Sequence, residues 1–262
     1  MIAEKIVGGP ARTFQVDSLA VRVYANQVDL SQDVARRAQQ CLSEAVSARG
    51  EAAAILATGN SQIRFLDELI RLGGVDWAKV TLFHMDEYLG IAGTHKASFR
   101  RYMRERVESR IKPRAFHYLE GDALLPMDEC ERYTKLLKAQ PIDLCCLGVG
   151  ENGHLAFNDP PVANFSDKRA VSIVKLDEKC RLQQVGEGHF PGMEAVPQYA
   201  LTLTIPMLCS AARMLCIAPE QRKAQAIRDA LKGPISTVCP ASVLRRQAHC
   251  TLFLDTDSAS LL

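Results

Sequence analysis

The sequence predicts an α/β fold with a mostly parallel sheet. Short apolar runs alternate with longer segments of helical periodicity, turn residues bound each run, and 47% of the 262 residues are hydrophobic. This apolar content is enough for a substantial core, so the chain is expected to be globular. The length is about 1.7 times a typical domain of roughly 150 residues, which admits one large domain or two small ones. Because no sharp change in composition marks a boundary, we expect a single domain over residues 1–262.

Five apolar runs are expected to form the strands, at residues 52–57, 80–84, 142–147, 214–218 and 250–254. Between the first two, apolar residues recur at helical spacing at Ile63, Leu66, Leu69 and Ile70. A second helix is indicated by the same spacing at Ala224, Ile227 and Leu231. Both helices should pack their apolar faces on the sheet.

Residues 159–198 differ from the rest of the chain. They combine prolines and glycines with scattered charge, and their apolar periodicity is weak. We expect a surface excursion that acts as a lid.

Charge and cysteine usage exclude several classes of protein. The 32 Lys and Arg residues against 30 Asp and Glu give a net charge of +2, which argues against a nucleic-acid partner. Nine cysteines without a C-x-x-C pair suggest neither a disulfide framework nor a zinc knuckle, so reduced thiols in the cytoplasm fit better. The N-terminus lacks the pattern of a secretory signal, and the longest uncharged stretch, 195–212, is interrupted by prolines. We therefore expect no membrane association.

The first candidate for chemistry is the turn after the 52–57 run. Thr58, Gly59, Asn60 and Ser61 lead into a helix, where hydroxyls and free main-chain N–H groups suit a phosphate. A turn glycine and an N-cap serine explain the same residues equally well.

Two acids follow the 80–84 run. Asp86 and Glu87 are adjacent, so on an extended chain they point in opposite directions and only one faces a shared pocket. The other acid can support the structure. A helix cap or a surface ion pair would explain either acid taken alone.

The third strand end carries a glycine-rich loop. Gly148, Gly150 and Gly153 match the G-x-G-x-x-G pattern of dinucleotide-binding proteins, but that pattern requires a helix directly afterwards. The pair at 160–161 is Pro-Pro, which leaves room for two helical turns at most, so we disfavour a dinucleotide. The glycines instead provide a bare turn that delivers His154, a residue suited to proton transfer.

At the fourth strand end, Arg222 and Lys223 begin a helix. Cations there oppose the helix dipole, and a bound anion would remove the conflict. A solvated lysine is the alternative interpretation, because the dipole opposes a surface cation by less than ~1 kcal/mol.

These segments together resemble the glucosamine-6-phosphate deaminase/isomerase family, which is related to 6-phosphogluconolactonases. The resemblance rests on four motifs in order, at 58–61 (TGNS), 85–90 (MDEYLG), 142–158 (IDLCCLGVGENGHLAFN) and 196–202 (VPQYALT). His95 and Ser98 follow the second motif, and the similarity extends through the helix at Lys223. It implies a Rossmann-like, three-layer α/β fold with a lid, no cofactor, no metal, and a small sugar phosphate as substrate. It also suggests a homo-oligomer, such as a hexamer.

The resemblance assigns roles to the matched residues. Asp86 corresponds to the base that moves a proton between C2 and C1, and His154 to the group that opens the pyranose ring. The turn 58–61 and Lys223 correspond to the phosphate site. Glu87, Gly150 and Gly153 are expected to support these residues.

Several residues depart from the family pattern. Asn152 stands where an acid is usual; its carbonyl can orient the imidazole but supplies no negative charge. Asp159 replaces a longer glutamate, and either Asp159 or, with less support, Glu151 is expected to supply the charge. Asn60 replaces a glycine. The lid does not reveal the second phosphate-binding arginine, for which Arg181 is the candidate.

Three functions remain open from the sequence. The leading one is an isomerising deaminase that converts a hexosamine 6-phosphate to a ketose phosphate and ammonia. The second is a lactonase in which His154 activates water against a sugar lactone. The third is a non-catalytic sensor of sugar phosphates.

Overall fold

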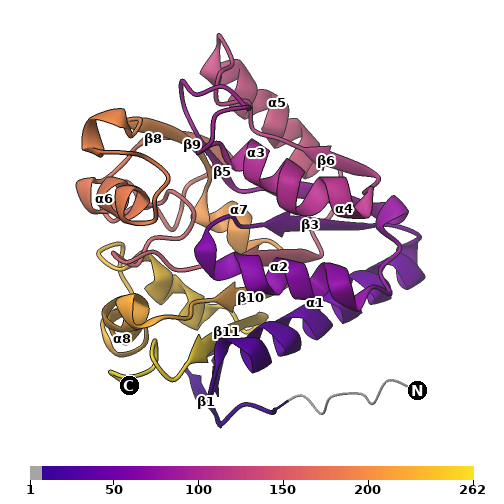
Figure 1. The fold of residues 1–262 in the computed structure, drawn as a ribbon, viewed down its shortest axis with the longest axis vertical. Helices are drawn as coiled ribbons and strands as arrows, with labels where there is room; N and C mark the ends of the chain where they lie inside the picture. The colour runs from indigo at the N-terminus through magenta and orange to yellow at the C-terminus, as the bar shows by residue number, and fades with distance from the viewer. Residues whose placement is uncertain (1–7) are drawn as a thin grey trace.

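The computed structural model describes residues 8–262 and contains a central parallel sheet covered on both faces by helices (Figure 1). In sheet order its strands are β1 (Arg12–Val16), β2 (Leu19–Tyr24), β11 (Cys250–Asp255), β10 (Arg213–Ile217), β7 (Leu144–Leu147), β3 (Ala52–Leu56), β4 (Val80–His84) and β6 (Ala115–His117). All neighbours pair in parallel except β1 and β2, which form an antiparallel hairpin. The predicted α/β class is confirmed.

The five predicted strands correspond to β3, β4, β7, β10 and β11, with ends that differ by at most two residues. The largest difference is at β7, which begins at Leu144. Ahead of it, the Asp143 carboxylate accepts a hydrogen bond from the main-chain N of Ala53, so a side chain replaces a ladder bond. The hairpin strands β1 and β2 were not predicted.

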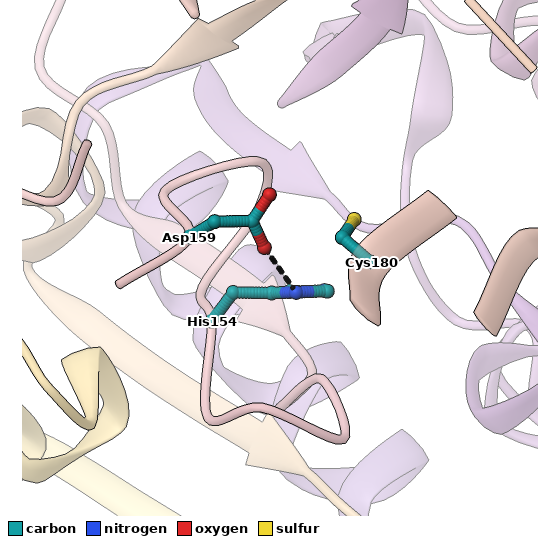
Figure 2. A group of neighbouring side chains, drawn as sticks. All are labelled: His154, Asp159 and Cys180. Carbon is teal, nitrogen blue, oxygen red and sulfur yellow. Dashed lines mark ion pairs between the residues drawn. The ribbon is translucent and has the colours of Figure 1, made fainter. Parts of the chain in front are cut away.

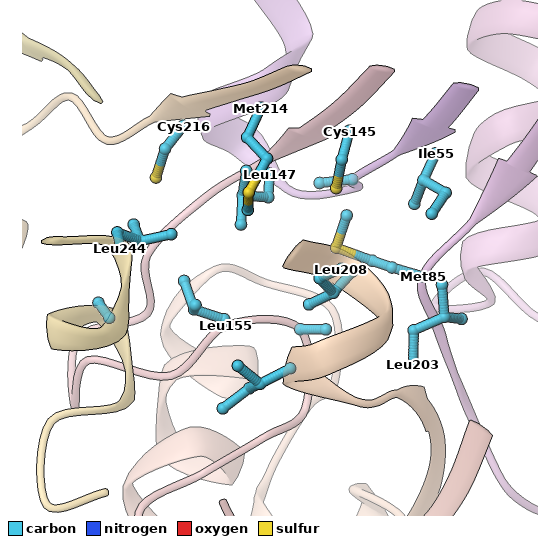
Figure 3. Packing of buried hydrophobic residues seen from close by; sticks show 14 of the residues in the cluster. Ile55, Met85, Cys145, Leu147, Leu155, Leu203, Leu208, Met214, Cys216 and Leu244 are labelled. Atoms are coloured by element: carbon cyan, nitrogen blue, oxygen red, sulfur yellow. The ribbon is translucent and has the colours of Figure 1, made fainter. Parts of the chain in front are cut away.

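Side chains alternate across each strand and fill two cores. On one face, α1 (Gln27–Arg49), α2 (Asn60–Leu72) and α3 (Phe99–Met103) cover Ala54 and Leu56 of β3. On the other face, α5 (Pro126–Lys138), α7 (Ile205–Cys209) and α8 (Ala224–Lys232) cover Ala53 and Ile55. Burial of both faces explains why these strands are continuous apolar runs. Figure 3 shows Cys145 and Cys216 of adjacent strands pointing into the second core.

Short helical segments complete the described chain. The π-helical turn Arg104–Glu108 joins α3 to α4 (Ser109–Ile111), and 3₁₀ turns occur at Trp77–Lys79, Met193–Ala195, Gln221–Lys223 and Pro240–Arg246. Among the helices of residues 8–262, none combines the length and apolar character that a membrane span requires.

The segment 159–198 is more ordered than its sequence indicates. It contains β8 (Val171–Lys175) and α6 (Glu178–Gly186), and β8 joins a second, antiparallel sheet in the order β5-β9-β8 with β5 (Asp86–Tyr88) and β9 (Tyr199–Leu203). This small sheet packs with α6 around a third core that contains Tyr88, Phe99, Phe157 and Phe190. Three of these four aromatics lie outside the segment, so its own periodicity could not reveal the core.

Candidate active site

The four strand ends singled out in the sequence line one cavity. They are joined there by residues of α6 and of the loop that follows it. A cavity at the carboxyl edge of a parallel sheet is the common ligand site of open α/β folds.

The turn between β3 and α2 offers an anion site. Gly59 is the N-cap of α2 and has a φ of +98°, a conformation that favours glycine. Helix α2 begins at Asn60, so Ser61 is not the N-cap, and the alternative explanation from helix capping does not hold. The Ser61 hydroxyl accepts a hydrogen bond from Gln62. Thr58, Gly59, Asn60 and Ser61 all line the cavity beside the N–H groups of the first turn of α2.

Asp86 is a buried carboxylate aimed into the cavity. Its residue is 6% exposed, and its Oδ1 has no hydrogen-bond partner within residues 8–262. Burial, followed by the charge of Glu87, raises the pKa of Asp86 well above its usual range. A carboxylate in this environment is a stronger base than one in water.

Glu87 points away from the cavity and holds the local structure together. Its carboxylate accepts hydrogen bonds from the Ser98 hydroxyl at 2.7 Å and from the main-chain N of Phe99 and Arg100. The Arg100 guanidinium lies 3.3 Å away and is itself buried. Asp86 and Glu87 therefore diverge, and Glu87 fixes the strand that carries Asp86.

Replacing Arg100 by Met is expected to lower the free energy of unfolding by about 3–5 kcal/mol, because it leaves the Glu87 charge buried without its counter-ion. Urea unfolding measures the change. Arg101→Met, which removes an exposed pair with Glu105, is the matched control and should cost less than about 1 kcal/mol. Equal losses in the two variants would contradict the role given to Arg100.

The loop after β7 presents His154 to the cavity. Residues 151–158 form turns, without the helix that a dinucleotide site requires. A Cβ at Gly150 would lie 2.3 Å from the imidazole, and one at Gly153 would lie 2.7 Å from Cys239 Sγ. A side chain at Gly150 would therefore displace the imidazole, and one at Gly153 would collide with Cys239.

His154 is paired with Asp159. Its Nδ1 lies 2.8 Å from Asp159 Oδ1, an ion pair when the ring is protonated (Figure 2). Asp159 is fully buried; burial would raise its pKa, but the contacts with His154, Asn152 and the main-chain N of Asp177 hold that pKa below its usual value. Glu151 instead pairs with Arg222, at 3.1 Å. Asp159 thus supplies the negative charge beside the histidine.

Asn152 does not orient the imidazole as the sequence suggested. Its Oδ1 accepts a hydrogen bond from the main-chain N of His154, and its Nδ2 donates to Asp159 Oδ1 at 3.0 Å. The Asn152 amide therefore holds the main chain of the loop and the Asp159 carboxylate, and this carboxylate contacts the imidazole. Local sequence spacing could not distinguish these two arrangements.

Lys223 is the buried cation of the cavity, with 3% of its surface exposed. Burial, followed by the charge of Arg222, lowers the pKa of Lys223. Arg222 also lines the cavity, but carboxylates of Glu220 and Glu187 lie 2.6 and 2.7 Å from its guanidinium. Lys223 is therefore the cation more available to an anion.

Segment 159–198 contributes residues that the sequence did not identify. Gln183, Gln184, Glu187 and His189 line the cavity. Burial would raise the pKa of Glu187, but contacts with His189 and Arg222 lower it to about 2. Arg181, the candidate for a phosphate contact, donates instead to the main-chain carbonyls of Met193 and Val196 and does not line the cavity.

The polar turn before α2, the buried Asp86 carboxylate and the His154–Asp159 pair meet at the strand ends of this sheet, which places the chain among the α/β proteins with a small-ligand site at that edge. The family model for glucosamine-6-phosphate isomerases/6-phosphogluconolactonase matches residues 25–253. The chain belongs to this family.

Two similar curated proteins are glucosamine-6-phosphate deaminases. The protein from Exiguobacterium sibiricum is 35% identical over 90% of this chain and 91% of the relative, and deaminase 1 from Giardia intestinalis is 34% identical over 84% of each chain. Among solved structures, a monomeric glucosamine-6-phosphate deaminase superposes with a TM-score of 0.85 at 31% identity, covering 92% of this chain and 99% of its own. A 6-phosphogluconolactonase from Shewanella baltica shares the fold, with a TM-score of 0.75 at 18% identity over 95% and 100% of the two chains.

Proposed function

We propose that the protein is a glucosamine-6-phosphate deaminase, which converts glucosamine 6-phosphate and water to fructose 6-phosphate and ammonia. The observation that carries the proposal is the convergence, in one cavity, of Asp86, the His154–Asp159 pair and an anion site at Lys223. Family membership and the deaminase relatives support the same substrate class.

His154 opens the pyranose ring. The imidazole takes the proton of the C1 hydroxyl and delivers a proton to the ring oxygen, so that the C1–O5 bond breaks and an open-chain aldehyde forms. Asp159 stabilises the imidazolium that exists between these two transfers, because its carboxylate lies 2.8 Å from Nδ1.

Asp86 then isomerises the aldehyde. Its carboxylate takes the proton from C2, the electron pair moves toward the carbonyl, and O1 takes up a proton from solvent to give an enolamine. The same carboxyl returns its proton to C1, which leaves a protonated imine at C2; the extra proton returns to solvent when water adds. Water adds to this imine, and ammonia departs to give the ketone. No external oxidant or reductant is required.

The phosphate is held by Lys223 and by the turn 58–61. Replacing Lys223 by Met is expected to weaken the binding of inorganic phosphate about 10- to 100-fold, because a hydrogen bond to a charged group contributes about 1.5–3 kcal/mol. Titration calorimetry measures this binding. Lys232→Met, at the exposed end of α8, is the control and should bind phosphate like the unsubstituted protein.

The affinity for phosphate should also depend on pH. The pKa of Lys223 is lowered, so this lysine loses its charge at a lower pH than an exposed lysine does. Phosphate binding should therefore weaken as the pH rises through that lowered value. A phosphate affinity that does not change over this pH range, or one that is unchanged in Lys223→Met, would show that the anion binds elsewhere.

The function is tested by incubating the purified protein with glucosamine 6-phosphate and galactosamine 6-phosphate and assaying ammonia and ketose phosphate. Ammonia released in a one-to-one ratio to the ketose phosphate supports the proposal. Hydrolysis of 6-phosphogluconolactone without ammonia release would assign the lactonase activity instead. Tight binding of sugar phosphates without turnover of any of them would assign a sensor.

Segment 159–198 acts in this proposal as a lid that closes over the bound sugar. The residues that support it are Gln183, Gln184 and Glu187, which belong to α6 or follow it and line the cavity together with the strand ends. The homo-oligomer indicated by the family resemblance stays a prediction. Light scattering over a range of protein concentrations tests it, and one relative in the family is monomeric.

A further inference from the structure

A thiol lies beside the histidine–carboxylate pair and has no role in the proposed reaction. Donor atoms of His154, Asp159 and Cys180 all lie within 4.8 Å of one another (Figure 2). Cys180 belongs to α6 and is 1% exposed, whereas His154 and Asp159 belong to the loop after β7. The three donors thus come from both sides of the junction between the lid and the sheet.

We propose that this triad binds a divalent cation of the zinc type, and that the bound ion inhibits the enzyme. An imidazole, a carboxylate and a thiolate form a borderline-soft donor set, which zinc prefers over magnesium or calcium. Donors of a tetrahedral zinc site lie roughly 3.5 Å apart, given bond lengths of about 2.0–2.3 Å. The His154 Nδ1–Asp159 Oδ1 distance of 2.8 Å would therefore have to widen, while the distances to Cys180 Sγ, within 4.8 Å, already lie near this range.

The state of His154 supports a ligand role. Its Nδ1 is buried and makes no aligned hydrogen bond within residues 8–262, although Asp159 Oδ1 is 2.8 Å away. A metal ion between the ring, the carboxylate and the thiol would engage this nitrogen. The Cys180 thiol proton and any proton on Nδ1 are released on coordination, and the remaining positions are open to water.

Two consequences follow from coordination. The imidazole held by the metal no longer exchanges protons with the sugar, so the reaction stops. In addition, the ion joins α6 to the histidine loop and should fix the lid to the rest of the molecule. Metal binding therefore stabilises the fold while it abolishes turnover. The inhibition rests on the proposed function, whereas the binding and the stabilisation do not.

Binding is tested with Zn²⁺ in calorimetry and with Co²⁺ in absorption spectroscopy, where a thiolate-to-cobalt band reports the sulfur ligand. The unsubstituted protein should bind one ion per chain and show the band. Cys180→Ser should lose the band and at least about 100-fold in affinity, because loss of an outer-shell partner alone costs about 10- to 100-fold. Cys209→Ser is the matched control and should behave like the unsubstituted protein. Cys209 is half-buried, whereas Cys180 is buried, and Cys209 lies in α7 outside the triad.

A second variant tests the same site in case Cys180→Ser does not fold. Asp159→Asn removes a ligand without touching the thiol and should also weaken Zn²⁺ binding, with circular dichroism and thermal unfolding checking both folds. Addition of Zn²⁺ should raise the midpoint temperature of thermal unfolding for the unsubstituted protein and leave it unchanged for Cys180→Ser. Absence of the cobalt–thiolate band, or equal Zn²⁺ affinity in Cys180→Ser, would overturn the site. Tight Zn²⁺ binding with undiminished ammonia release would overturn the inhibition and contradict the role of His154, but would leave the metal site standing.

Discussion

Replacing Asp86 by Asn is expected to lower kcat for ammonia release about 10²- to 10⁴-fold, the range by which a positioned general base accelerates a reaction. The amide keeps the shape of the side chain but cannot accept the C2 proton. Asp76→Asn is the control and should retain full activity, because it replaces an exposed carboxylate that precedes β4, at the end of the strand away from Asp86. Inorganic phosphate should bind both variants like the unsubstituted protein, since the anion site does not include Asp86.

The same substitution should stabilise the fold. Burial and the charge of Glu87 raise the pKa of Asp86 in the folded chain above its unfolded value near 3.8. The protonated carboxyl therefore favours folding below pH 3.8, and this contribution is lost as the pH rises through the raised pKa. Each pKa difference of one corresponds to about 1.4 kcal/mol.

The side chain introduced by Asp86→Asn does not ionise. The difference in unfolding free energy between this variant and the unsubstituted protein should therefore increase with pH and vanish in acid. Urea unfolding at several pH values measures this difference. An Asn variant that is less stable at every pH would show that Asp86 contributes a structural hydrogen bond, and its loss of activity could not then be assigned to chemistry alone. Reduced activity combined with increased stability is the signature of a base kept in an unfavourable environment.

Replacing His154 by Gln is the second change with a large expected effect. It should lower kcat about 10²- to 10⁴-fold, because the amide cannot transfer a proton between the C1 hydroxyl and the ring oxygen. Binding of inorganic phosphate should stay unchanged, since the proposed anion site does not include His154. His249→Gln is the control; that ring contacts the Cys209 carbonyl, outside the cavity.

The pH profile of kcat/KM tests the role given to Asp86. With Asp86 acting as base in its ionised form, kcat/KM of the unsubstituted protein should fall as the pH drops through the raised pKa of Asp86, at a higher pH than an ordinary aspartate would give. An acid limb at the position of an exposed aspartate would contradict the burial argument. Loss of phosphate binding in His154→Gln would instead mean that the histidine serves the anion site.

The sequence predicted the centre of the fold better than its edges. The strands at 52–57 and 250–254 are buried on both faces, so their apolar runs are unambiguous. Strands β8 and β9 belong to a small sheet whose pairing with β5 spans more than a hundred residues, and no local pattern encodes such a contact. The hairpin strand β1 is largely exposed and lacks a continuous apolar run.

The candidate site shows the same division. Residues that lie directly at strand ends, such as Asp86, His154 and Lys223, could be found because the topology of a parallel sheet brings those ends together. The partners Asn152 and Arg181 were assigned wrong contacts, since their hydrogen bonds depend on the turn geometry of the loop and on the lid. The proximity of Cys180 to Asp159 was not predicted, because it arises only when α6 packs against the histidine loop.

The central claim is that Asp86 moves a proton from C2 to C1 of glucosamine 6-phosphate and that ammonia leaves as a result. The most direct measurement follows the conversion of glucosamine 6-phosphate carrying deuterium at C2, with ammonia assayed and the ketose phosphate analysed by NMR. We expect one ammonia per fructose 6-phosphate and part of the deuterium at C1, with both products lost in Asp86→Asn. Release of no ammonia by the unsubstituted protein, or equal deuterium transfer by Asp86→Asn, would contradict the claim.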